Sequence, residues 1–85
     1  MNFKTVTKYM RQMVLNQENK FPTEGPLSYS HIIWMLNEID NFATPENNDK
    51  ANRWVGWAQC AIVSAGCYNL DDMKKINSSV IIKTI

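Results

Sequence analysis

The chain has few of the residues that build metal and phosphate sites. Its 85 residues include three glycines, two cysteines and one histidine. Zinc sites take three or four ligands at short spacings, and no further ligand follows His31 at three or four residues. The glycines do not cluster, which argues against a glycine-rich phosphate loop. We therefore expect no metal and no cofactor.

The two cysteines do not suggest a disulfide or a nucleophile. Cys60 and Cys67 lie seven residues apart on one predicted helix, about 10 Å apart along its axis, too far for a disulfide. We read them as reduced thiols of a cytosolic protein. A triad with His31 is conceivable, but burial as small apolar side chains is the favoured interpretation. Glu38 and Asp40 do not share a helix face, so we predict that the chain is not an enzyme.

Long apolar runs and a strong net charge are also absent. No apolar run approaches the ~20 residues that span a bilayer, so we expect no membrane insertion. No apolar segment follows the basic residues near the N-terminus, so we expect no signal peptide. The net charge of +1 excludes a strongly basic nucleic-acid-binding protein and an acidic mimic of DNA. This total conceals two basic ends around an acidic middle, residues 21–49.

The hydrophobic content is sufficient for a core. Hydrophobic residues make up 45% of the chain and include three tryptophans and five methionines. A chain of this length buries roughly 60% of its unfolded surface, so a monomer is expected to be only marginally stable. We predict one helical domain, residues 1–85, for which formation of a homo-oligomer would add stability.

Apolar periodicity and capping residues predict four helices. The first covers residues 3–18 and ends before Pro22. The second covers residues 28–42 with Ser28 as its N-cap. Thr44 and Pro45 open the third, which Gly66 ends as the left-handed residue after the helix. A short fourth helix covers residues 70–76, and residues 78–85 are either extended or a continuation of it.

The start of this fourth helix carries a variant of the capping box, in which Asn69 caps and Asp72 follows three residues later. The third helix is apolar on nearly every side between residues 51 and 67. We therefore predict an all-α fold, a small bundle of three main helices and a short fourth helix around a central apolar helix, about residues 45–66. The residues expected to pack in its core are Trp54, Gly56, Trp57, Ala61 and Leu70.

Basic residues form a stripe on the first helix. Lys4, Lys8 and Arg11 follow an i, i+4, i+7 spacing, which suits a contact with a polyanion or with an acidic protein. The alternative is the solvated face of an amphipathic helix. Lys50 and Arg53 are candidates for an additional anion contact.

Arg53 is otherwise surrounded by apolar residues and needs a partner. A salt bridge to Asp71 or Asp72 is the first interpretation, and a contact with an anion or a protein partner is the second.

Aromatic residues and methionines are numerous for such a small chain. Trp, Tyr, Met and Arg are enriched where proteins bind one another, so we expect at least one tryptophan at an interface. The first two helices are where we expect a partner to bind. The candidate partner-binding residues are Lys4, Lys8, Arg11, Tyr29, Trp34 and Met35.

Residues 50–77 carry a recognisable pattern. Its first part is Arg53, Trp54, Val55, Gly56, Trp57 and Gln59. Its second part is Gly66, Tyr68, Leu70, Asp71, Asp72 and Met73. This pattern resembles that of small accessory proteins of tailed bacteriophages.

The resemblance implies an early phage protein in the cytoplasm of the bacterial host. Such a protein would bind and inhibit or modify a host protein, of which antiviral-defence factors are the leading candidates. The residues leave two alternatives open, a nucleic-acid- or nucleotide-binding module that uses the basic stripe, and a structural homo-oligomer or assembly factor.

Overall fold

The computed structural model describes residues 2–82, with side chains described up to residue 78. Its α-helices are α1 (Phe3–Leu15), α2 (Tyr29–Phe42), α3 (Asn48–Ser64) and α4 (Leu70–Ile82). Two short 3₁₀ turns, Glu18–Lys20 and Pro45–Asn47, precede α2 and α3. The described residues contain no strand, so the predicted all-α bundle is confirmed. None of these helices is long and apolar enough to cross a membrane.

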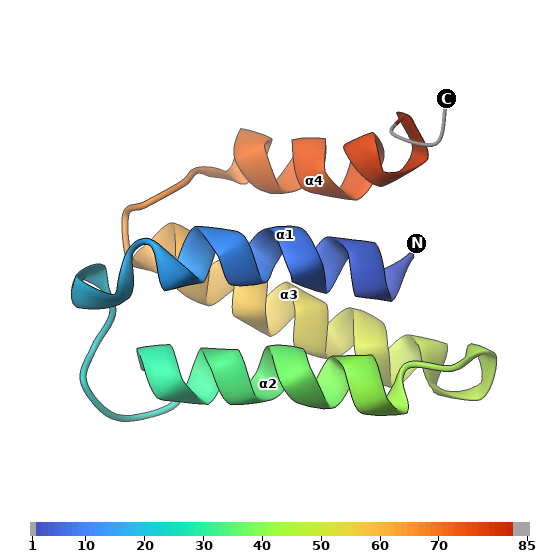
Figure 1. Ribbon diagram of the computed structural model, residues 1–85, viewed down its shortest axis with the longest axis horizontal. Coiled ribbons are helices and arrows are strands. Elements are labelled where there is room, and N and C mark those ends of the chain that lie inside the picture. The colour runs from blue at the N-terminus through green and yellow to red at the C-terminus, as the bar shows by residue number, and fades with distance from the viewer. Residues whose placement is uncertain (1, 83–85) are drawn as a thin grey trace.

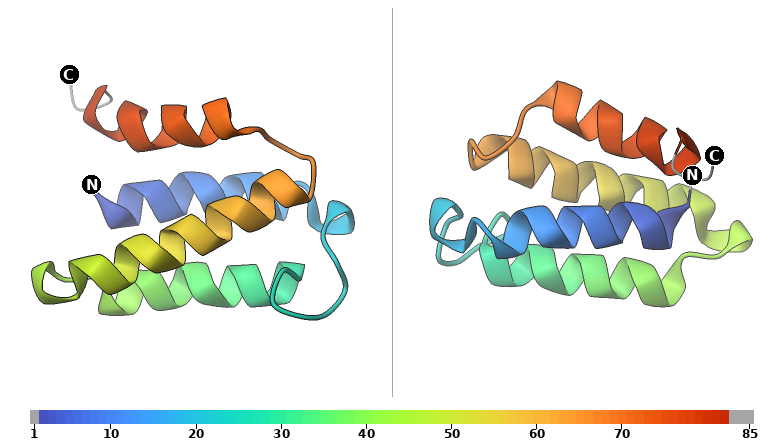
Figure 2. Two further views of the ribbon diagram at one scale, coloured as in Figure 1. Left: turned by 180° about the vertical axis from the view of Figure 1, so that it is seen from behind. Right: turned by 45° about the horizontal axis from the view of Figure 1, so that its top comes forward.

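The helices form a bundle in which α1 contacts each of the other three. Figure 1 shows α1 between α4 and α2, with α3 running behind α1 and α2. The view from behind in Figure 2 shows α3 crossing obliquely over α1 and α2. The predicted third helix packs against both α1 and α2, and α1 shares the central position with it.

α1 begins and ends close to the predicted positions. Asn2 caps it by accepting the backbone N–H of Thr5 at 3.2 Å. The helix ends at Leu15, three residues before the predicted end. The next turn is wound as a 3₁₀ helix, and Phe21 is extended because a proline follows it.

α2 begins as predicted. The backbone N–H of His31 donates to the Ser28 hydroxyl at 3.3 Å, which confirms Ser28 as the N-cap. The helix turns the side chains of Ile32, Leu36 and Ile39 into the core, where they are fully buried.

The start of α3 differs from the prediction. Thr44 makes no capping hydrogen bond through its side chain, and Pro45 opens a 3₁₀ turn instead of the α-helix. The α-helix begins at Asn48 and ends as predicted before Gly66, whose φ of +81° suits a glycine. Its buried residues form one stripe and not a full apolar circumference. They are Ala51, Val55, Ala58, Ala61 and Ile62.

α4 begins with the predicted capping box and is longer than predicted. The Asn69 side chain accepts the N–H of Asp72 at 2.9 Å, and the Asp72 carboxylate accepts the N–H of Asn69 at 2.9 Å. The helix continues to Ile82, so residues 78–82 extend it. Residues 83–85, for which the sequence left two conformations open, lie outside the described residues.

Candidate protein-docking surface

Aromatic rings line the seam between α2 and α3. The Trp34 and Trp54 ring centroids are 5.6 Å apart, and Trp54 meets Phe42 edge-on at 5.0 Å. His31 lies 5.5 Å from Trp34 on the same helix. We call these four residues, together with Trp57, the aromatic face.

Helix geometry explains why these rings meet. On α2, His31 and Trp34 are three residues apart, and Phe42 follows Trp34 after eight, so the three lie on one side of the helix. Trp54 and Trp57 share a side of α3 for the same reason. Figure 1 shows α2 and α3 running in opposite directions, which brings the end of α2 beside the start of α3.

Two tryptophans of the aromatic face are open to solvent. Trp34 is 49% exposed and Trp57 is 44% exposed, whereas Trp54 and Phe42 are half-buried against the core. The indole N–H of Trp57 donates to the carbonyl of Pro26 at 3.1 Å, which fixes the orientation of its ring. Exposed indole rings held by neighbouring groups can bind apolar side chains with little loss of conformational entropy.

Lys50 lies at one end of the aromatic face. Its ammonium group is 4.4 Å from the Phe42 ring centroid and 5.4 Å from a Trp54 ring centroid, a cation–π arrangement. Among the described residues it has no carboxylate partner. Lys50 therefore retains the ability to bind an anionic group of a partner.

Arg53 is exposed and makes no ion pair within the described part of the chain. The predicted salt bridge to Asp71 or Asp72 is therefore wrong for a single chain. Asp72 caps α4, and Asp71 is exposed.

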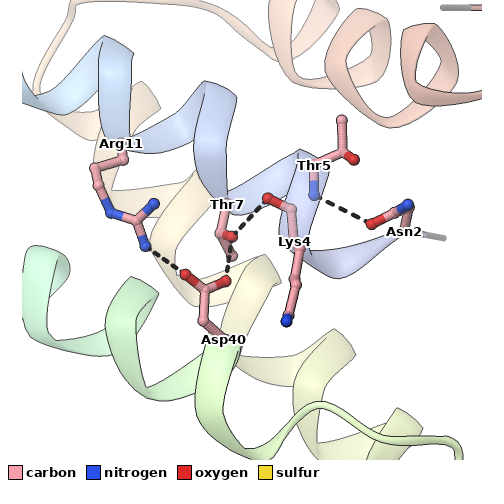
Figure 3. A network of polar contacts seen from close by, with 6 residues as sticks. All are labelled: Asn2, Lys4, Thr5, Thr7, Arg11 and Asp40. Atoms are coloured by element: carbon pink, nitrogen blue, oxygen red, sulfur yellow. Dashed lines mark hydrogen bonds and ion pairs between the residues drawn. The ribbon is translucent and has the colours of Figure 1, made fainter.

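Arg11 is paired within the chain. Its guanidinium contacts the Asp40 carboxylate at 2.8 Å, with the two side chains 27% and 30% exposed. The buried hydroxyl of Thr7 donates to the other oxygen of Asp40 (Figure 3). Arg11 therefore joins α1 to α2, and the predicted basic stripe keeps only Lys4 and Lys8 as exposed cations.

Two other predicted partner-binding residues are not part of the aromatic face. Met35 is 6% exposed and belongs to the core, because α2 turns it inward with Ile32 and Leu36. The prediction that it binds a partner is wrong. Tyr29 is half-buried and packs edge-on against Phe21, with ring centroids 6.4 Å apart.

Three predicted core residues are exposed. Gly56 and Trp57 are exposed on α3, outside its buried stripe, and Leu70 is 67% exposed at the start of α4. The prediction failed because it took α3 to be enclosed on every side. Ala61 is buried and Trp54 packs against the core, as predicted.

The remaining candidate residues for chemistry are the two cysteines and His31. The described side chains contain no group of three His, Cys, Asp or Glu residues that could hold a metal ion. Cys60 is exposed, which contradicts its predicted burial, and Cys67 is half-buried. His31 packs against Trp34 of the aromatic face.

No protein-family model matches the chain, and no similar curated protein or solved structure was found. His31 and Phe42 were not predicted to belong to a binding surface. The spacing of His31 and Trp34 was a usable signal, but the meeting of Trp34 with Trp54 depends on how α2 and α3 are rotated against each other.

Proposed function

We propose that this chain is a non-enzymatic protein-binding module that docks its partner on the aromatic face. The proposal rests on Trp34 and Trp57, two tryptophans that are about half exposed. The neighbouring rings of Trp54 and Phe42 pack against the core and hold this surface in place. Tryptophan is among the residues that contribute most to binding energy at protein interfaces. Contiguous exposed apolar surface on a soluble domain is typical of an interaction site.

The aromatic face also supplies polar groups. Within the described residues, the indole N–H of Trp34 has no acceptor, so it can donate to a partner. Lys50 adds a cation at the end of the face. An apolar surface with a few directional polar groups at its edges suits a protein partner.

The resemblance of residues 50–77 to phage accessory proteins supports a narrower proposal. We propose that the partner is a host bacterial protein of antiviral defence, bound in the host cytoplasm and inhibited or modified by the contact. This part rests on the resemblance and not on the geometry of the aromatic face.

The test compares two variants that remove an exposed apolar side chain. Tagged wild-type chain, Trp34→Ala and Leu15→Ala are each incubated with bacterial lysate, and the retained proteins are quantified by mass spectrometry. Leu15 is the matched control, because it is 53% exposed and lies on α1. We expect wild type and Leu15→Ala to retain the same stoichiometric partner, and Trp34→Ala to retain at least tenfold less.

Thermal unfolding followed by circular dichroism is the folding control. Trp34→Ala has to remain folded at the temperature of the binding experiment. Retention of no stoichiometric partner by the wild type contradicts the proposal. Equal retention by Trp34→Ala contradicts the assignment of the aromatic face.

The nucleic-acid alternative has less support. Of its five candidate cations, Arg11 is paired with Asp40, and Lys50 packs over Phe42 and Trp54. Few free cations predict weak binding that is lost as salt is raised. Retention of labelled single-stranded DNA or RNA at moderate salt would revive this alternative.

A further inference from the structure

An open apolar groove lies between α3 and α4. It has a volume of about 250 Å³, and its walls include Gly56, Cys60, Val63, Leu70 and Met73. At 67%, Leu70 is the most exposed of the large apolar side chains that the structure describes. The described part of this chain therefore leaves an apolar groove uncovered beside an exposed leucine.

Within the described residues, nothing around Gly56 requires a glycine at this position. It lies in the middle of α3, and a Cβ atom built there would meet nothing within 4 Å. Glycine weakens a helix relative to alanine. The open space over Gly56 is thus available to another backbone that approaches α3 closely.

Opposite charges flank this groove: neither Arg53 nor Asp71 lines it, but each lies within one helical turn of a residue that does. Arg53 lies one turn before Gly56 on α3, and Asp71 directly follows Leu70 at the start of α4. Both side chains are exposed, and neither has a partner of opposite charge among the described residues. α3 and α4 run in opposite directions, so the start of α4 lies near the end of α3 (Figures 1 and 2).

From these charges we infer that a second copy of this chain occupies the groove. The α3 helices of the two copies would pack antiparallel about a two-fold axis near residues 56–60. Such an axis exchanges the two ends of the groove, so Arg53 of each copy would lie beside Asp71 of the other. This arrangement is isologous, as in most homodimers, and it makes each complementary charge contact twice.

The sequence predicted a salt bridge between Arg53 and Asp71 or Asp72, which does not form within one chain. In the dimer, Arg53 would make this contact with Asp71 of the other copy. The dimer would also cover Leu70 and fill the space over Gly56. The groove lies on the side of α3 that faces α4, whereas the aromatic face lies on the side that faces α2. The inference is therefore independent of the proposed function.

Charge reversal provides the test. Analytical ultracentrifugation over micromolar to submillimolar concentrations is expected to show a monomer–dimer equilibrium for the wild type. Arg53→Asp and Asp71→Arg each place like charges together twice, so each variant is expected to dimerise at least tenfold more weakly. Mixed in equal amounts, the two variants should form a heterodimer with wild-type affinity, because both contacts are then complementary.

Lys8→Asp is the matched control, since Lys8 is an exposed cation on α1, away from the groove. It should dimerise like the wild type. A wild type that is monomeric at all concentrations overturns the inference. Failure of the mixed variants to associate, or equal weakening by Lys8→Asp, overturns the proposed arrangement.

Discussion

At the scale of single residues, Asp40 links two helices through two different partners. It accepts the Thr7 hydroxyl and pairs with Arg11, so one carboxylate satisfies a fully buried hydroxyl and a half-buried cation (Figure 3). Arg11 alone looked like part of a surface stripe in the sequence. Its pairing could not be predicted, because Asp40 lies 29 residues away and the rotation of α2 decides where it points.

Replacing Asp40 with alanine is expected to destabilise the fold by about 1–3 kcal/mol, because it removes two hydrogen bonds to a charged group that join α1 to α2. The measurement is urea unfolding followed by circular dichroism. Glu38→Ala is the control, since Glu38 is a carboxylate on the same helix with no ion pair in the described structure. It should change the free energy of unfolding by less than about 0.5 kcal/mol. If the two variants change the free energy of unfolding equally, the contacts of Asp40 with Thr7 and Arg11 do not stabilise the fold.

At the scale of helices, α4 is attached differently from the rest. α1, α2 and α3 pack against one another, whereas α4 packs mainly against α1. One of its links to α3 is a hydrogen bond from the Gln59 amide to the Asn77 side chain at 2.9 Å. We therefore expect α4 to open locally more readily than the other helices.

Hydrogen exchange can test this expectation through the N-cap of α4. Asn69→Ala removes one half of the capping box and is expected to cost about 1 kcal/mol of helix stability. If α4 opens on its own, its amides should exchange roughly fivefold faster, while those of α2 should not change. Faster exchange throughout the protein would instead show that α4 unfolds only with the whole domain.

The helix ends illustrate what local sequence determines. Ser28, Asn69 and Gly66 act through neighbours within three or four residues, so their roles were predictable. Which sides of α3 are buried was not predictable from local sequence in the same way. The small and aromatic residues of α3 indicated that every side of the helix is buried. The other three helices are too few and too short for that, and they bury one stripe of α3.

At the scale of the whole molecule, the residues of the 50–77 segment contribute to two surfaces. Trp54 and Trp57 belong to the aromatic face, while Gly56, Leu70 and Met73 line the groove beside α4. The sequence placed the partner surface on the first two helices. We now propose that it spans α2 and α3, because Trp34 meets Trp54 across the seam.

The separation of the two surfaces leads to a prediction about stoichiometry. If the aromatic face binds a partner and the groove binds a second copy, the wild-type complex should contain two chains and two partner molecules. Arg53→Asp should disrupt the contact between copies while leaving Trp34 and Lys50 in place. Light scattering of the purified complexes should then give half the mass for this variant, with the same ratio of chain to partner. Loss of the partner together with the second copy would instead show that the two surfaces are not independent, because the partner then binds only the assembled dimer.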